Sequence, residues 1–188
     1  EVRKLRSRCQ SVLSKTPSIF RSHLFCFLSS VRSIGSGRRY LIGGNWKCNG
    51  TLAENEARIK VFNDAGPIPA NVDVVLCVPY IHIPMVLEKV RKDITVGAQN
   101  CGNNTGNGAF TGEVGAHQIK DIGCTWVIIG HSERREGFGM PGEPVELCAQ
   151  KTKIALEKGL KVMFCIGMFK KNSFLIAFLL RAKNLIGF

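Results

Sequence analysis

The sequence predicts an α/β fold built on a parallel sheet, and two observations support this. Short β-rich runs whose successive residues are mostly apolar occur at 40–45, 73–78, 94–98, 125–130 and 161–167. Runs of this kind are typical of strands that are buried on both faces. Segments with helical spacing lie between them, at 52–65, 82–91, 114–122 and 144–158. The alternation of strand and helix leaves two architectures open, a doubly wound sheet and a (β/α) barrel.

The elements follow one another with recognisable boundaries. After the strand at 40–45, the segment 52–65 places several apolar side chains on related helical faces (Leu52, Ala53, Ala57, Val61 and Phe62). The strands at 73–78 and 94–98 are separated by the helical segment 82–91. The segment 114–122 leads to the strand at 125–130, and the last helix, 144–158, is followed by Gly159, a typical helix stop. The order is therefore β-α-β-α-β-α-β-α-β, with right-handed crossovers.

Composition excludes several classes of protein. The chain has 188 residues, of which 45% are hydrophobic, so a mainly disordered chain is excluded. Its apolar runs are shorter than the roughly 18–20 residues that cross a bilayer, which argues against an integral membrane protein. The eight cysteines form no C-x-x-C pair. We therefore expect buried, reduced thiols and no metal site.

The net charge of +12 lies entirely at the two ends. Residues 1–40 contribute +8 and residues 168–188 contribute +4, whereas residues 41–167 carry thirteen basic and thirteen acidic side chains. A nucleic-acid-binding domain needs positive charge where it contacts phosphates, so we expect no nucleic-acid partner.

Three regions are expected. Residues 1–39 are rich in Arg and Ser and nearly free of acids, as in transit peptides, and are expected to be disordered. As a transit peptide they would direct the chain to a plastid or mitochondrion; as a basic tail without an address they would leave it in the cytoplasm. Residues 40–167 form the folded domain, and residues 168–188 form a separate apolar and basic tail.

Polar clusters follow three of the predicted strands. They are Asn45 and Lys47 after the first strand, Gln99 and Asn100 after the third, and the run from His131 to Arg134 after the fourth. Each cluster alone has an ordinary structural explanation, such as a solvated loop charge or an ion pair at a helix start. Parallel α/β folds display their sites at the carboxyl ends of strands, so the clusters together predict binding of a small oxyanionic substrate. Neither G-x-G-x-x-G nor G-x-S-x-G is complete, which disfavours dinucleotide binding and serine hydrolysis.

Four motifs in register resemble the triosephosphate isomerase family. They are GNWKCNG (44–50), AQNC (98–101), GAFTGE (108–113) and IGHSERR (129–135). The resemblance spans residues 40–167 and implies a partial TIM (β/α)8 barrel with about five parallel strands. It also implies a glycolytic and gluconeogenic isomerase that interconverts dihydroxyacetone phosphate and glyceraldehyde 3-phosphate, without cofactor or metal.

The resemblance assigns roles to individual residues. Lys47 corresponds to the ammonium that binds the substrate and offsets its negative charge, and Asn45 to the amide that orients it. His131 corresponds to the electrophile and Glu133 to the carboxylate beside it. Removing a proton next to a carbonyl builds charge on oxygen, so donors must already point there. The pairing of a neutral histidine with a glutamate base is known from this same enzyme family.

The sequence departs from the family after Gly167. The family's barrel has eight strands and carries a glutamate base after the sixth, whereas Met168 begins a tail without family motifs. We therefore expect weak or no activity from this chain, and a non-catalytic half-barrel fragment or binding module is the alternative. The family also forms homodimers through the segment 101–115, which makes Cys48, Gln99, Thr111 and Glu113 candidate dimer contacts.

Overall fold

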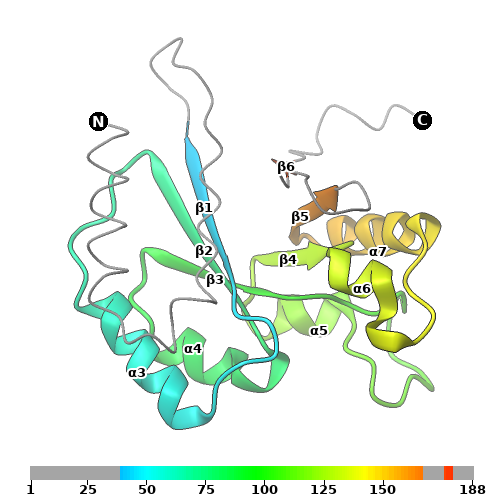
Figure 1. Cartoon of the computed structure of the whole chain (residues 1–188), viewed down its shortest axis with the longest axis horizontal. Helices are drawn as coiled ribbons and strands as arrows, with labels where there is room; N and C mark the ends of the chain where they lie inside the picture. The colour runs from blue at the N-terminus through cyan, green and yellow to red at the C-terminus, as the bar shows by residue number, and fades with distance from the viewer. Residues whose placement is uncertain (1–38, 167–175, 180–188) are drawn as a thin grey trace.

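A computed structural model describes residues 39–166 and 176–179 (Figure 1). The predicted transit-like extension, Arg39 apart, lies outside these residues. The predicted tail at 168–188 also lies outside them, apart from 176–179.

The core of the fold is a curled sheet whose strands lie side by side in chain order (Figure 1). Five strands are mutually parallel: β1 (Tyr40–Asn45), β2 (Val72–Val78), β3 (Ile94–Ala98), β4 (Trp126–Ile129) and β5 (Lys161–Ile166). A doubly wound sheet would reverse its strand order at a switch point, and this sheet does not. The sequential order therefore decides between the two predicted architectures and confirms a partial (β/α) barrel.

A sixth strand, β6 (Ile176–Leu179), pairs antiparallel with β5. It lies within the predicted tail, for which no strand was predicted. The sheet thus changes from parallel to antiparallel at its last pair.

Helices connect the parallel strands as predicted. They are α3 (Leu52–Asn63), α4 (Ile83–Lys89), α5 (Ala116–Asp121) and α7 (Val145–Glu157), and a short 3₁₀ turn, η1 (Tyr80–His82), precedes α4. A capping box starts α3: the Thr51 hydroxyl accepts from the Glu54 amide, and the Glu54 carboxylate accepts from the Thr51 amide. Besides β6 and η1, α6 (Ser132–Glu136) and the 3₁₀ turn η2 (Gly137–Gly139), which follow β4, were not predicted.

The middle strands are buried on both faces, which explains why the predicted runs are mostly apolar. Alternate strand residues pack outward against the helices, among them Val78 and Val127, which are fully buried against residues such as Ile83. The intervening residues form a second cluster on the inner face, built from Val75, Cys77, Trp126, Ile128, Met163 and Cys165. The barrel's two layers of packing therefore persist in the described half.

None of the six cysteines in the described residues forms a disulfide. Five of these six cysteines are buried, and Cys48 is exposed. Burial raises the pKa of Cys124 and of Cys165 to about 11, so both are protonated at neutral pH. Within the described ranges, no helix is long and apolar enough to cross a membrane.

Candidate active site

The candidate site lies at the carboxyl ends of β1, β3 and β4. Asn45 is the last residue of β1, and Lys47 follows two residues later. Gln99 directly follows β3, and His131 follows β4 after a single glycine. Because the strands are parallel and adjacent in the order β1-β2-β3-β4, their carboxyl ends meet at one rim.

The backbone of Lys47 adopts the left-handed conformation, with φ of 52°. Two side chains hold it there. The Asn45 Oδ1 accepts a hydrogen bond from the Lys47 amide at 2.9 Å, and the Gln99 Nε2 donates to the Lys47 carbonyl at 3.0 Å. The same Gln99 nitrogen also donates to the carbonyl of Cys77, the next-to-last residue of β2, at 3.1 Å. A strained conformation of this kind persists only where its surroundings fix it, and here Asn45 at the end of β1 and Gln99 just after β3 do so.

Lys47, Glu133 and His131 form one connected group. The Lys47 Nζ lies 2.5 Å from the Glu133 Oε1, although the two residues are 86 positions apart. The other carboxylate oxygen of Glu133 lies 3.4 Å from the His131 Nδ1. All three side chains are partly accessible, His131 least, with 17% of its side chain exposed. The group therefore faces solvent with a cation, a carboxylate and an imidazole in contact.

The surroundings of His131 favour the neutral ring. Burial lowers its pKa, and the nearby Lys47 ammonium acts in the same direction, while the Glu133 carboxylate opposes them; the net shift is downward. The ring also caps α6, since its Nδ1 accepts a hydrogen bond from the Glu133 amide at 3.3 Å. An accepting Nδ1 places the proton of the neutral ring on Nε2. His131 therefore presents an uncharged N–H donor.

The structure brings together some of the predicted residues and not others. Asn45, Lys47, Gln99, His131 and Glu133 meet at the rim, as the positions of their motifs predicted. In this structure the Gln99 side chain contacts the Lys47 backbone. Its role at a dimer interface stays a prediction.

The other three candidate dimer contacts are exposed at the surface. Thr111 and Glu113 are exposed on the segment between β3 and α5, and Cys48 is exposed beside Lys47. Their role as dimer contacts stays a prediction.

Sequence reasoning missed a buried ionic cluster behind the rim. Glu143 Oε1 accepts from the Arg134 Nε at 2.5 Å and from the Lys151 Nζ at 2.8 Å, and only 10% of the Glu143 side chain is exposed. One signal was available: Lys151 occupies the face of α7 that also carries Cys148, Ile154 and Ala155, at spacings of three and four residues. A lysine on a buried helical face needs a carboxylate partner.

The described residues contain no group of three or more His, Cys, Asp or Glu side chains placed to hold a metal ion. The rim group contains one imidazole and one carboxylate, and that carboxylate already pairs with an ammonium. The arrangement is suited to binding an anion and moving protons.

Comparison with known proteins points to one family. The sequence profile described as triosephosphate isomerase matches residues 40–173, past the residue 167 that the motifs indicated. The cytosolic triosephosphate isomerase of rice (Oryza sativa subsp. japonica) is 44% identical over 133 residues, which cover 70% of this chain and 51% of the relative. The chloroplastic triosephosphate isomerase of rye (Secale cereale) is 47% identical over 137 residues, covering 73% and 44%. The triosephosphate isomerase of Taenia solium is 44% identical over 130 residues, covering 69% and 50%. The chain spans about half the length of these curated relatives.

Proposed function

Since the chain belongs to the triosephosphate isomerase family, we propose that its rim group is the N-terminal part of an isomerase site for dihydroxyacetone phosphate and glyceraldehyde 3-phosphate. The observation that carries the proposal is the contact of Lys47, Glu133 and His131 at the carboxyl ends of β1 and β4. Three chemically different groups from motifs far apart in the sequence meet at the face where parallel barrels carry out chemistry.

Each residue has a part in the proposed reaction. Lys47 binds the phosphate-bearing substrate by its positive charge, and Asn45 fixes the backbone from which that side chain extends. The Nε2–H of His131 donates to the carbonyl oxygen as negative charge develops in the enediolate. A neutral ring matches the proton affinity of that oxygen better than a cation does, and a donor fixed beforehand stabilises the developing charge. Glu133 orients the Lys47 ammonium and places its own amide on His131 Nδ1.

The resemblance assigns the general base to a glutamate after a sixth parallel strand, beyond the matched residues. General-base catalysis contributes typically about 10²–10⁴-fold. We therefore expect the 188-residue chain by itself to bind the substrate weakly and to turn it over little or not at all.

The test measures binding and turnover separately. Titration of the full chain with dihydroxyacetone phosphate, followed by NMR on a chain labelled at histidine, should shift the His131 ring signals. Lys47→Ala should abolish the shift, because the phosphate loses its cation. Lys60→Ala is the matched control, since Lys60 is also ion-paired but lies on α3.

Two outcomes would contradict the proposal or one of its parts. Equal binding by Lys47→Ala and by the unmodified chain would remove Lys47 from the site. Turnover by the 188-residue chain that disappears in Lys47→Ala would contradict the expected need for a further base, and would also exclude the non-catalytic half-barrel.

A further inference from the structure

The loop between β1 and α3, residues 46–51, carries Lys47 to the rim. Three residues after Lys47, the carbonyl oxygen of Gly50 is approached by two side chains from other elements. The His82 Nε2 lies 3.0 Å from this oxygen, and the Asn55 Nδ2 donates to it at the longer distance of 3.5 Å. His82 ends η1 and Asn55 lies on α3, so the loop is connected at Gly50 to two neighbouring elements.

Both side chains are buried where they meet the loop. Asn55 is 0% exposed and His82 is 5% exposed. A carbonyl oxygen only accepts hydrogen bonds, so the His82 Nε2 carries a proton and donates it to Gly50. The other ring nitrogen, Nδ1, is buried and has no hydrogen-bond partner in the part of the chain that the structure describes. A phenyl ring would fill similar space without an unpartnered nitrogen, but it could not bind the carbonyl.

A further series of contacts fixes the Asn55 amide. The Arg58 Nη1 donates to the Asn55 Oδ1 at 2.9 Å. A guanidinium only donates, so the amide oxygen faces Arg58 and the amide nitrogen faces Gly50. The Arg58 guanidinium also lies over the Trp46 ring, 4.6 Å from its centroid. Trp46 is buried and directly precedes Lys47, so the chain is fixed just before Lys47 and again three residues after it.

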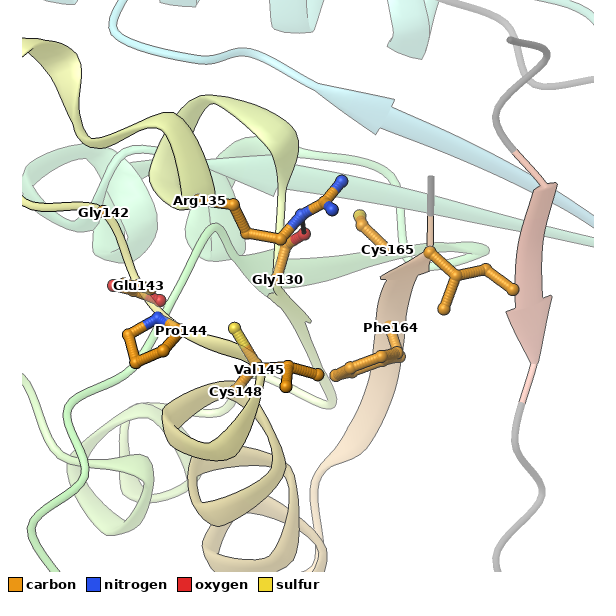
Figure 2. Close-up of a pocket in the computed structure, with 10 residues that line it drawn as sticks. Gly130, Arg135, Gly142, Glu143, Pro144, Val145, Cys148, Phe164 and Cys165 are labelled. Atoms are coloured by element: carbon orange, nitrogen blue, oxygen red, sulfur yellow. Dashed lines mark hydrogen bonds between the residues drawn. The ribbon is translucent and has the colours of Figure 1, made fainter. Parts of the chain in front are cut away.

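The backbone beside His131 is held by a similar contact. Gly130 directly precedes His131, and its carbonyl accepts a hydrogen bond from the Arg135 Nε at 3.0 Å (Figure 2). Gly130 and Gly50 both have positive φ, 72° and 97°, a conformation that glycine adopts without steric cost. At both places a glycine turns the chain close to a rim residue, and a side chain binds the carbonyl of that glycine.

We propose that His82 and Asn55 are positioning residues for the rim. By binding the Gly50 carbonyl, they fix the loop from which the Lys47 ammonium extends. That ammonium ends a flexible four-carbon side chain, so its position depends on where the loop holds the backbone. A binding group is effective only when its supporting contacts keep it near the productive geometry. On the function proposed above, the ammonium binds the substrate, and this step of the inference rests on that function.

The first measurement needs no ligand. His82→Phe keeps a buried ring and removes the N–H, whereas His82→Gln keeps an N–H donor. Amide hydrogen exchange, followed by NMR on the full 188-residue chain, should become faster at Lys47 in His82→Phe and stay near the unmodified rate in His82→Gln. His117→Phe is the matched control, because the His117 Nε2 also has a polar contact, 2.8 Å from the Asn107 Oδ1, but His117 lies on α5.

The second measurement is substrate affinity. Titration with dihydroxyacetone phosphate, read from the His131 ring signals, should show about fivefold weaker binding by His82→Phe, in line with the loss of one hydrogen bond. Binding by His82→Gln and by His117→Phe should stay close to that of the unmodified chain. Urea unfolding of each variant establishes that folded proteins are compared. If His82→Phe does not fold, Asn55→Leu removes the other donor at similar size, and exchange and affinity should change in the same direction.

Several outcomes would overturn the inference. One is an unchanged exchange rate at Lys47 in both His82→Phe and Asn55→Leu, and another is faster exchange with unchanged substrate affinity. Weaker binding that His82→Gln does not restore would assign the effect to packing and not to the hydrogen bond. If the unmodified chain does not bind dihydroxyacetone phosphate, the isomerase proposal fails, and the exchange rates alone then decide whether His82 and Asn55 fix the loop.

Discussion

Lys47 combines an unusual backbone conformation with a side chain that contacts Glu133 at the rim. Its φ of 52° lies in the region where L-residues pay about 1–2 kcal/mol of steric energy, and glycine does not. The Lys47 amide donates to the Asn45 side chain and the Lys47 carbonyl accepts from the Gln99 side chain, and these two hydrogen bonds hold the conformation. Glycine would fit the backbone better, which agrees with the proposed role of the Lys47 ammonium in substrate binding.

This leads to a comparison of two substitutions at one position. Lys47→Ala and Lys47→Gly both remove the ammonium, but only glycine relieves the backbone. We expect Lys47→Gly to be more stable than Lys47→Ala by about 1 kcal/mol in urea unfolding. A difference near zero, or one favouring alanine, would show that the left-handed conformation is not maintained when the side chain is absent.

Among the elements, α6 and α7 are joined by the buried carboxylate of Glu143. Burial alone would raise the pKa of Glu143, but hydrogen bonds and positive charge from Arg134 and Lys151 outweigh it, and the net shift is downward. Removing the carboxylate would leave the Lys151 ammonium buried, with 6% of its side chain exposed, and without this partner. Losses of about 3–5 kcal/mol are typical when one partner of a buried pair is removed.

The cluster should make stability depend on pH. The folded pKa of Glu143 lies below its ordinary value near 4.5. The unfolded chain therefore takes up the proton first, so the contribution is fully present above about pH 4.5 and is lost as the pH falls below it. Urea unfolding should show a steeper loss of stability below pH 4.5 in the unmodified chain than in Glu143→Gln. Parallel curves for the two proteins would contradict this assignment.

The elements that could be predicted from the sequence are those whose apolar pattern follows directly from burial. The parallel strands were recognisable because most of their residues are at least partly buried, so each run is mostly apolar. The segment SERRE that forms α6 has no apolar period, and its five residues are fixed by the His131 cap and a left-handed Gly137. Strand β6 depends on pairing with β5, which no local pattern specifies.

The rim residues were predictable for a different reason. Their motifs lie directly after strands, and parallel strands bring such positions together. The tautomer of His131 and the bonds from Gln99 to Lys47 could not be predicted, because they depend on distances across elements.

Across the whole molecule, the net positive charge lies outside the residues that form the predicted folded domain. The positive charge of residues 1–40 stands beside a neutral domain. Its relatives include a cytosolic and a chloroplastic protein, so the family occurs in both compartments.

Residues 1–39 should therefore determine the compartment by themselves. Fused to a fluorescent protein in plant cells, they should direct it to a plastid or mitochondrion. Replacing Arg3, Lys4, Arg6 and Arg8 with Gln should return it to the cytoplasm, because such addresses depend on positive charge. Cytoplasmic fluorescence from the unchanged fusion would show that the segment is a basic tail without an address.

The contact between Lys47 and Glu133 also bears on the order in which parts of the fold form. It closes a loop of 86 residues and joins the first parallel strand to the helix after the fourth. Closing so long a loop is entropically costly, and contacts between distant residues slow folding. The rim should therefore be among the last parts of the fold to form, after the local strand–helix units. A spectroscopic probe on this pair would report when the first four strands have come together during refolding.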